Sequence, residues 1–115
     1  MKVQQEATRV HALMEVVGAL LEEGRVKEAE AVIAGYALCA LAALEQGTLS
    51  AEDAGRAFVT MDFYLNNETS ASFSEELADV IQEGECLHHY GEPDAEASGL
   101  RAEFLRQRAV AILSA

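Results

Sequence analysis

Tryptophan is absent from the 115-residue sequence, proline occurs once, at Pro93, and cysteine occurs twice. A chain with a single proline has little to interrupt long helices, because proline is the residue that breaks them most strongly. Two cysteines cannot build the disulfide framework that stabilises small secreted domains. Cys39 lies inside an apolar run, so we expect a buried free thiol, a reducing compartment and a cytoplasmic protein.

Long hydrophobic runs are missing as well. The most apolar stretch is residues 31–44, whereas a helix that spans a bilayer needs about 20 apolar residues. The first ten residues, MKVQQEATRV, lack the basic-then-apolar pattern of a secretory signal. We therefore expect no membrane span and no signal peptide. The length suits one domain, residues 1–115, with one hydrophobic core.

Positive charge is scarce, since eight Lys and Arg stand against twenty Asp and Glu, and the formal net charge is −12. Residues 51–99 carry most of this imbalance, with twelve acidic residues and one basic residue, Arg56. Such a segment repels phosphate groups and anionic lipids, so binding to nucleic acid or to a membrane surface is not expected. The glycine-rich phosphate loops GxxxxGK and GxGxxG are also absent. A basic protein partner, a bound cation or solubility alone remain as explanations of the acidic charge.

The residues that are present favour helix. Ala, Leu, Glu and Val dominate the composition, and apolar residues recur at steps of three and four along the chain. Gly24 and Gly47 follow such stretches and are natural helix stops, which predicts helices over residues 2–23 and 25–46 joined as an antiparallel hairpin. The second of these is apolar nearly all round between residues 31 and 44, so we expect its neighbours to surround it.

Three further helices are predicted after Gly47. The third opens at Ser50, where an Asp three residues later can complete the cap. The fourth is capped by Ser72 or Ser74, and the fifth begins near Pro93, because proline is favoured in a first helical turn. Apolar faces at helical spacing support them, namely Ala54, Phe58, Met61 and Leu65, then Phe73, Leu77, Val80 and Ile81, then Leu100, Phe104, Leu105, Ala109 and Ile112. The predicted fold class is all-α, a compact bundle of about five helices.

The stretch GECLHHYGEPD, residues 84–94, holds a thiol, two imidazoles and several carboxylates. A zinc site needs three or four converging ligands, but residues one or two apart on a helix point in different directions. We interpret the stretch as a helix end, with imidazoles near the last carbonyls and Gly91 reversing the chain. A regulatory zinc site on Cys86 and His89 is the alternative. Acidic neighbours make Cys86 a poor nucleophile.

The run SEELADVI, residues 74–81, resembles the second acidic helix of the MazG-like nucleotide pyrophosphatases, in which an ExxD pair helps to hold magnesium. The resemblance covers eight residues and implies Glu76 and Asp79 for that pair, with Glu75 and Glu83 as further candidate ligands. The upstream EExxE motif of that family is absent from this chain. The resemblance nevertheless makes a magnesium-dependent nucleotide hydrolase the alternative function. A helix face exposed to solvent explains the same carboxylates without a bound ion.

Asp62 lies within the apolar segment AFVTMDFYL. A carboxylate that is buried without a partner costs several kcal/mol. We expect Asp62 either to point outward at the edge of the buried stripe or to form a structural ion pair. The available bases are Arg56 and, in the last helix, Arg101, Arg106 and Arg108.

With no convincing catalytic constellation, the acidic middle segment is the main indication of function. A surface of one sign speeds encounter with an oppositely charged partner. We interpret the protein as a small acidic interaction module, an inhibitor, immunity-type or regulatory protein that binds a basic protein without catalysis or a cofactor. The predicted partner-binding carboxylates are Glu52, Asp53, Glu75, Glu76, Asp79 and Glu83. Apolar groups on the second helix and on more than one face of the third further predict a homodimer.

Overall fold

The structure, a computed structural model, describes residues 2–67, 72–91 and 95–114. The regular structure in these ranges is helical and confirms the predicted all-α bundle. It comprises α1 (Lys2–Glu22), α2 (Val26–Gln46), α3 (Ala51–Asn67), α4 (Glu75–Glu85), a short 3-10 helix η1 (Cys86–His89) and α5 (Ala95–Ser114). Within the described ranges, none of the helices combines the length and the hydropathy that a membrane span requires.

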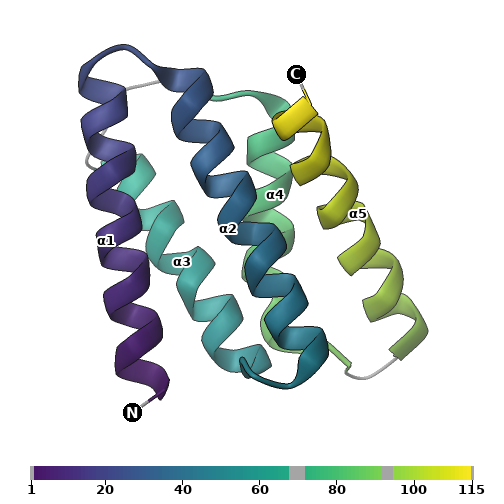
Figure 1. Cartoon of the computed structure of the whole chain (residues 1–115). Helices are drawn as coiled ribbons and strands as arrows, with labels where there is room; N and C mark the ends of the chain where they lie inside the picture. The colour runs from purple at the N-terminus through teal and green to yellow at the C-terminus, as the bar shows by residue number, and fades with distance from the viewer. Residues whose placement is uncertain (1, 68–71, 92–94, 115) are drawn as a thin grey trace.

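The five α-helices form two layers (Figure 1). α1, α2 and α5 lie side by side in one layer, and α3 and α4 lie behind them. α2 is the central helix, because it packs against α1 and α5 within its own layer and against α3 and α4 in the other. The core fills the space between the layers, and its largest fully buried side chains include Ile33, Leu41, Phe58, Met61, Leu77 and Leu105.

The predicted ends of the first helices are confirmed. Gly24 and Gly47 have φ angles of 74° and 80°, a left-handed conformation that glycine adopts without the steric cost of a Cβ. α1 and α2 therefore form the expected antiparallel hairpin (Figure 1). The start of α3 also matches its prediction, because the Asp53 backbone N–H donates to Ser50 Oγ at 3.1 Å.

Ser74, and not Ser72, caps α4. The Ser74 hydroxyl oxygen accepts a hydrogen bond from the Leu77 backbone N–H at 3.2 Å. Ser74 also donates twice to Glu30 of α2, from its backbone N–H at 2.9 Å and from its hydroxyl at 2.5 Å. The Glu30 side chain therefore lies at the positive end of the α4 dipole, which stabilises a carboxylate that is only 8% exposed. The expected start of the fifth helix at Pro93 lies outside the described residues.

The prediction that neighbours surround α2 and bury Cys39 is wrong. Cys39 is an exposed free thiol, and Ala42 is exposed on the same side of the helix. The reason is the two-layer arrangement, in which α1 and α5 flank α2 and the second layer covers only its back (Figure 1). An uncharged helix face is therefore left open to solvent.

Candidate functional site

The carboxylates predicted to bind a partner are divided between two helices that run in opposite directions. Glu52 and Asp53 lie in the first turn of α3, and Glu75 and Glu76 lie in the first turn of α4. The end of α4 packs beside the beginning of α3, where it contacts Gly55. The two acidic first turns consequently lie at opposite ends of the bundle, and the structure does not join them into one patch.

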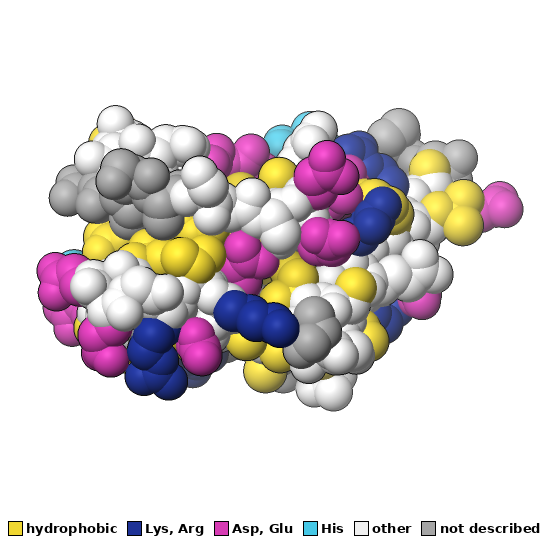
Figure 2. Space-filling model, turned by 90° about the horizontal axis from the view of Figure 1, so that it is seen from above, with side chains coloured by type: hydrophobic (Ala, Val, Ile, Leu, Met, Phe, Trp, Pro, Cys, Tyr) yellow, Lys and Arg dark blue, Asp and Glu magenta, His cyan; other side chains and the backbone are white. Residues whose placement is uncertain are grey.

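The other two predicted carboxylates face arginines of α5. Asp79 lies 3.2 Å from Arg108, and Glu83 lies 3.0 Å from Arg101. These ion pairs fasten α4 to α5 and neutralise the side of α4 that faces α5. Figure 2 shows the same mixture on one end of the molecule, where Asp and Glu side chains alternate with Lys, Arg and apolar side chains.

The four candidate magnesium ligands, Glu75, Glu76, Asp79 and Glu83, do not converge on one point. Asp79 and Glu83 are held by arginines of α5. In the part of the chain that the structure describes, no group of three or more His, Cys, Asp or Glu side chains is placed to hold a metal ion. These four carboxylates therefore do not form the ligand set that the magnesium-dependent alternative requires.

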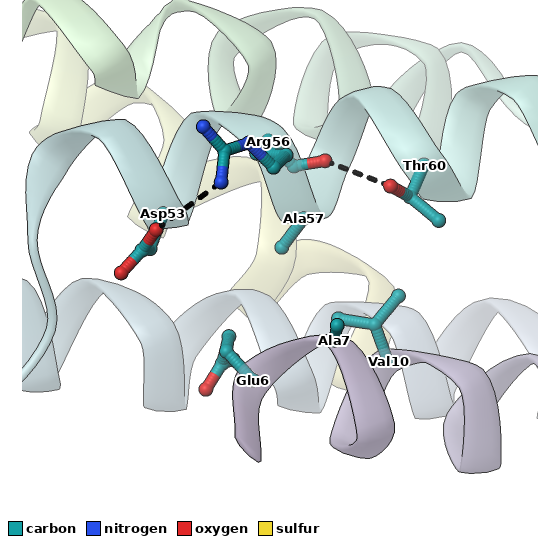
Figure 3. A pocket seen from close by; sticks show the side chains of 7 residues that line it. All are labelled: Glu6, Ala7, Val10, Asp53, Arg56, Ala57 and Thr60. Carbon is teal, nitrogen blue, oxygen red and sulfur yellow. Dashed lines mark hydrogen bonds and ion pairs between the residues drawn. The ribbon is translucent and has the colours of Figure 1, made fainter. Parts of the chain in front are cut away.

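A small groove lies between the beginnings of α1 and α3 (Figure 3). Arg56 extends beside it toward Asp53, at 3.7 Å, and also binds Glu52 at 2.7 Å. On the α1 side, the buried Glu6 accepts hydrogen bonds from Tyr36 and Arg9. The charged side chains of both walls, Arg56 with Asp53 on α3 and Glu6 on α1, already have partners within the protein. We therefore do not take this groove as a binding site for a charged ligand.

Glu6 has a structural role. The Tyr36 hydroxyl of α2 donates to its carboxylate, and only 7% of Glu6 is exposed. Burial and the neighbouring Glu6 raise the pKa of Tyr36 far above its ordinary value. The pair therefore keeps a neutral tyrosine bound to a carboxylate and joins α1 to α2.

Asp62 differs from the other acidic residues, and the ion pair predicted for it is wrong. Its carboxylate accepts a hydrogen bond from Asn66 Nδ2 at 2.7 Å. It also lies close enough to Glu85, at the end of α4, to raise the pKa of that residue. The arginines that were expected to reach it are bound to other carboxylates, namely Arg56 to Glu52, Arg101 to Glu83, Arg106 to Glu45 and Arg108 to Asp79. Asp62 is half-buried at the edge of the apolar stripe, as the other expectation had it.

Asp62 and Glu85 lie in a groove between α3 and α4, which we call the α3–α4 groove. Its empty space amounts to about 560 Å³, part of it open to solvent. The two carboxyl groups and two amides supply its polar atoms, and the rest of its lining is apolar. The lining residues are Asp62, Leu65, Asn66, Phe73, Leu77, Ala78, Ile81, Gln82 and Glu85.

The carboxyl pair holds a proton near neutral pH. The hydrogen bond to Asp62 raises the pKa of Glu85 to about 7, with smaller contributions from burial and from the Asp62 charge. Two carboxylates so close together cannot both ionise without repulsion unless a cation lies between them. The groove thus combines an apolar wall with two carboxyl groups. A bound proton, and not a basic side chain, offsets part of their negative charge.

The stretch GECLHHYGEPD forms a helix end over its described residues, as predicted. α4 ends at Glu85, the chain tightens into η1, and Gly91 has a φ angle of 84°. His88 Nδ1 lies 2.7 Å from the carbonyl oxygen of Glu85, within hydrogen-bonding distance of a backbone carbonyl at the end of α4. Leu87 is buried against the core, and His88 is exposed. The stretch also delivers Glu85 to the groove.

The pairing of Asp62 with Glu85 was not found from the sequence. The two residues are on different helices, and each one by itself matches a common pattern, an acid at a stripe edge and an acid in a last turn. The available signal was that Asp62 is acidic within an apolar segment while the basic residues of the chain are few. No protein-family model, curated protein or solved structure matches this chain.

Proposed function

We propose that this protein is a non-catalytic interaction module that binds a basic protein partner through the α3–α4 groove, as an inhibitor, immunity-type or regulatory protein. The observation that supports this most directly is the pairing of Asp62 with Glu85, because in the described residues each arginine is bound to another carboxylate. A lysine or arginine of a partner would replace the proton that the pair now holds.

The lining of the groove suits the two parts of such a side chain. A long basic side chain has an aliphatic stem and a charged end. Leu65, Leu77 and Ile81 offer apolar surface to the stem, while Asp62 and Glu85 offer carboxylates to the charged end. A charge-assisted hydrogen bond to a carboxylate is roughly twice as strong as a neutral one.

Among the carboxylates predicted from the sequence, Glu75 gives this proposal the most support. It lies three and seven residues before Ala78 and Gln82, which line the groove, so helical spacing places it on the same side of α4. Glu76, Asp79 and Glu83 lie toward α5, and Glu52 and Asp53 lie at the end of α3 that is distant from the groove. We expect these five to act through long-range attraction.

The test is capture of a partner from the cells that make the protein, with matched variants as bait. One bait carries Asp62→Asn and Glu85→Gln, which removes the acids of the groove and keeps a side chain able to hydrogen-bond at each position. The control bait carries Glu15→Gln and Glu22→Gln, which removes two exposed carboxylates from α1. Both baits lose two formal charges, and since the groove pair holds a proton near neutral pH, the α1 control loses at least as much actual charge as the groove variant.

We expect a basic protein to be retained by the wild type and by the α1 control and to be lost by the groove variant. Equal loss from both variants would attribute binding to net charge and contradict the groove. Unchanged retention by the groove variant would overturn the proposal. Binding should also weaken below pH 7, where the partner has to displace a proton, by up to about tenfold per pH unit.

A further inference from the structure

The outer face of α2 is a feature that the proposed function leaves unused. Cys39 and Ala42 are exposed on it. Gly35 lies one turn before Cys39, and no atom of another helix or of a neighbouring side chain lies within 4 Å of where its Cβ would be. The face is therefore open along the middle of the helix, with small side chains that allow a close approach.

This open face continues onto α1 and α5. Val16 of α1 is 51% exposed and lies between Leu13 and Leu20, which are half-buried against the core. On α5, Val110 and Leu113 are 46% and 45% exposed. They follow Arg106, which binds Glu45 of α2, by four and seven residues, so they lie on the side of α5 next to α2.

The face also lacks the acids that cover much of this protein. No charged residue occurs in α2 from Ala31 to Leu44, whereas the chain as a whole carries −12. The charged groups at the rim are already paired, Arg9 with Glu6, Arg106 with Glu45, and Glu28 of α2 with Arg25. Solvent-exposed helix faces ordinarily carry charged residues, so a broad uncharged face points to a protein contact.

We infer that a second copy of this chain covers the face, and that the protein is a homodimer built on α2 with flanking parts of α1 and α5. The charge distribution favours this face over the acidic parts of the surface for contact with a second copy. Two copies with the same strongly negative charge repel each other wherever their carboxylates meet, and this face has none that are unpaired. A basic partner would gain no attraction here, because its complementary charges lie on α3 and α4. Gly35, Cys39 and Ala42 let two helices pack at the short end of the usual range of about 8–10 Å between axes.

The experiment is sedimentation equilibrium of the full chain at micromolar concentration, with two double variants. The α2 variant carries Cys39→Glu and Ala42→Glu, which places four carboxylates in the dimer contact. The control carries Val59→Glu and Phe63→Glu, which adds the same charge at two exposed apolar residues of α3. We expect the wild type and the control to have twice the chain mass of 12.4 kDa and the α2 variant to have that mass once.

A wild-type mass of one chain would overturn the inference, and so would an α2 variant that stays dimeric or a control that dissociates to the same degree. Maleimide labelling of the Cys86→Ser variant, in which Cys39 is the remaining thiol, gives an independent readout without a change on the face. Labelling that slows as the protein concentration rises supports the dimer. A rate that is independent of concentration contradicts it, whatever the folding state of the glutamate variants.

Discussion

The ring of Phe58 in α3 lies directly against Gly84 in α4. A Cβ on Gly84 would lie 2.2 Å from Cγ of Phe58, well inside the closest approach of carbon atoms in proteins. Phe58 is fully buried, so a shift of its ring would have to displace neighbouring side chains of the core. This contact sets the spacing of α3 and α4 and thereby the width of the groove that holds Asp62 and Glu85.

Gly84→Ala should lower the free energy of unfolding by up to about 2 kcal/mol, because overpacking of the buried ring costs about 1–3 kcal/mol and the gain in helix propensity returns about 1 kcal/mol. Chemical denaturation followed by circular dichroism measures the change. Gly99→Ala is the matched control, since no neighbouring atom lies within 4 Å of its would-be Cβ. It should leave stability unchanged or increase it. Equal stability of the two variants would contradict the close packing described.

Ser74→Ala should destabilise the protein by about 2–4 kcal/mol, because it removes the cap of α4 and a hydrogen bond to a buried carboxylate. Ser72→Ala is its control, since Ser72 is exposed and precedes the helix. We expect no measurable change in the thermal midpoint from the control. If Ser72→Ala were the more damaging of the two, the cap would be misassigned.

The pair formed by Asp62 and Glu85 should make stability depend on pH in a definite direction. The folded protein holds the Glu85 proton up to a pKa of about 7, whereas the unfolded chain releases it near 4.5. The folded state therefore binds more protons between these values, and stability falls as pH rises from about 4.5 to about 7. Below about pH 4.5 the stabilising contribution of the protonated pair is fully present. Above about pH 7 both carboxylates are charged, and that contribution is lost.

Asp62→Asn should weaken this dependence, because the neighbouring charge that helps to raise the pKa of Glu85 is replaced by a neutral amide that can also donate to the Glu85 carboxylate, while the contribution of burial remains. Relative to the wild type, the variant should gain stability progressively between pH 4.5 and 7. Denaturation curves across that range measure the difference, and carboxyl NMR titration of Glu85 measures the pKa itself. Glu15→Gln, a charge removal on α1, should give a parallel curve. An unshifted Glu85 in the wild type would refute the pairing.

The sequence by itself determined the helices and most of their ends. Apolar spacing in α3 identified the buried residues Ala54, Phe58, Met61 and Leu65, all of which are in the core. Gly24, Gly47 and Ser50 marked helix ends because a left-handed glycine and a serine cap act within a few residues of where they stand. These features depend on local conformation, which adjacent residues specify.

Only the tertiary structure decided which faces meet. An apolar helix such as α2 can be covered on any side, and the order of the layers left Cys39 outside. Several arginines could have reached Asp62, and the packing of α4 against α5 assigned them elsewhere and gave Asp62 a carboxyl neighbour. The packing of α2 against α4 likewise brings Glu30 into hydrogen-bond contact with Ser74, 44 residues away in the sequence. Such contacts depend on how whole helices are placed against one another, and helical periodicity carries no information about that placement.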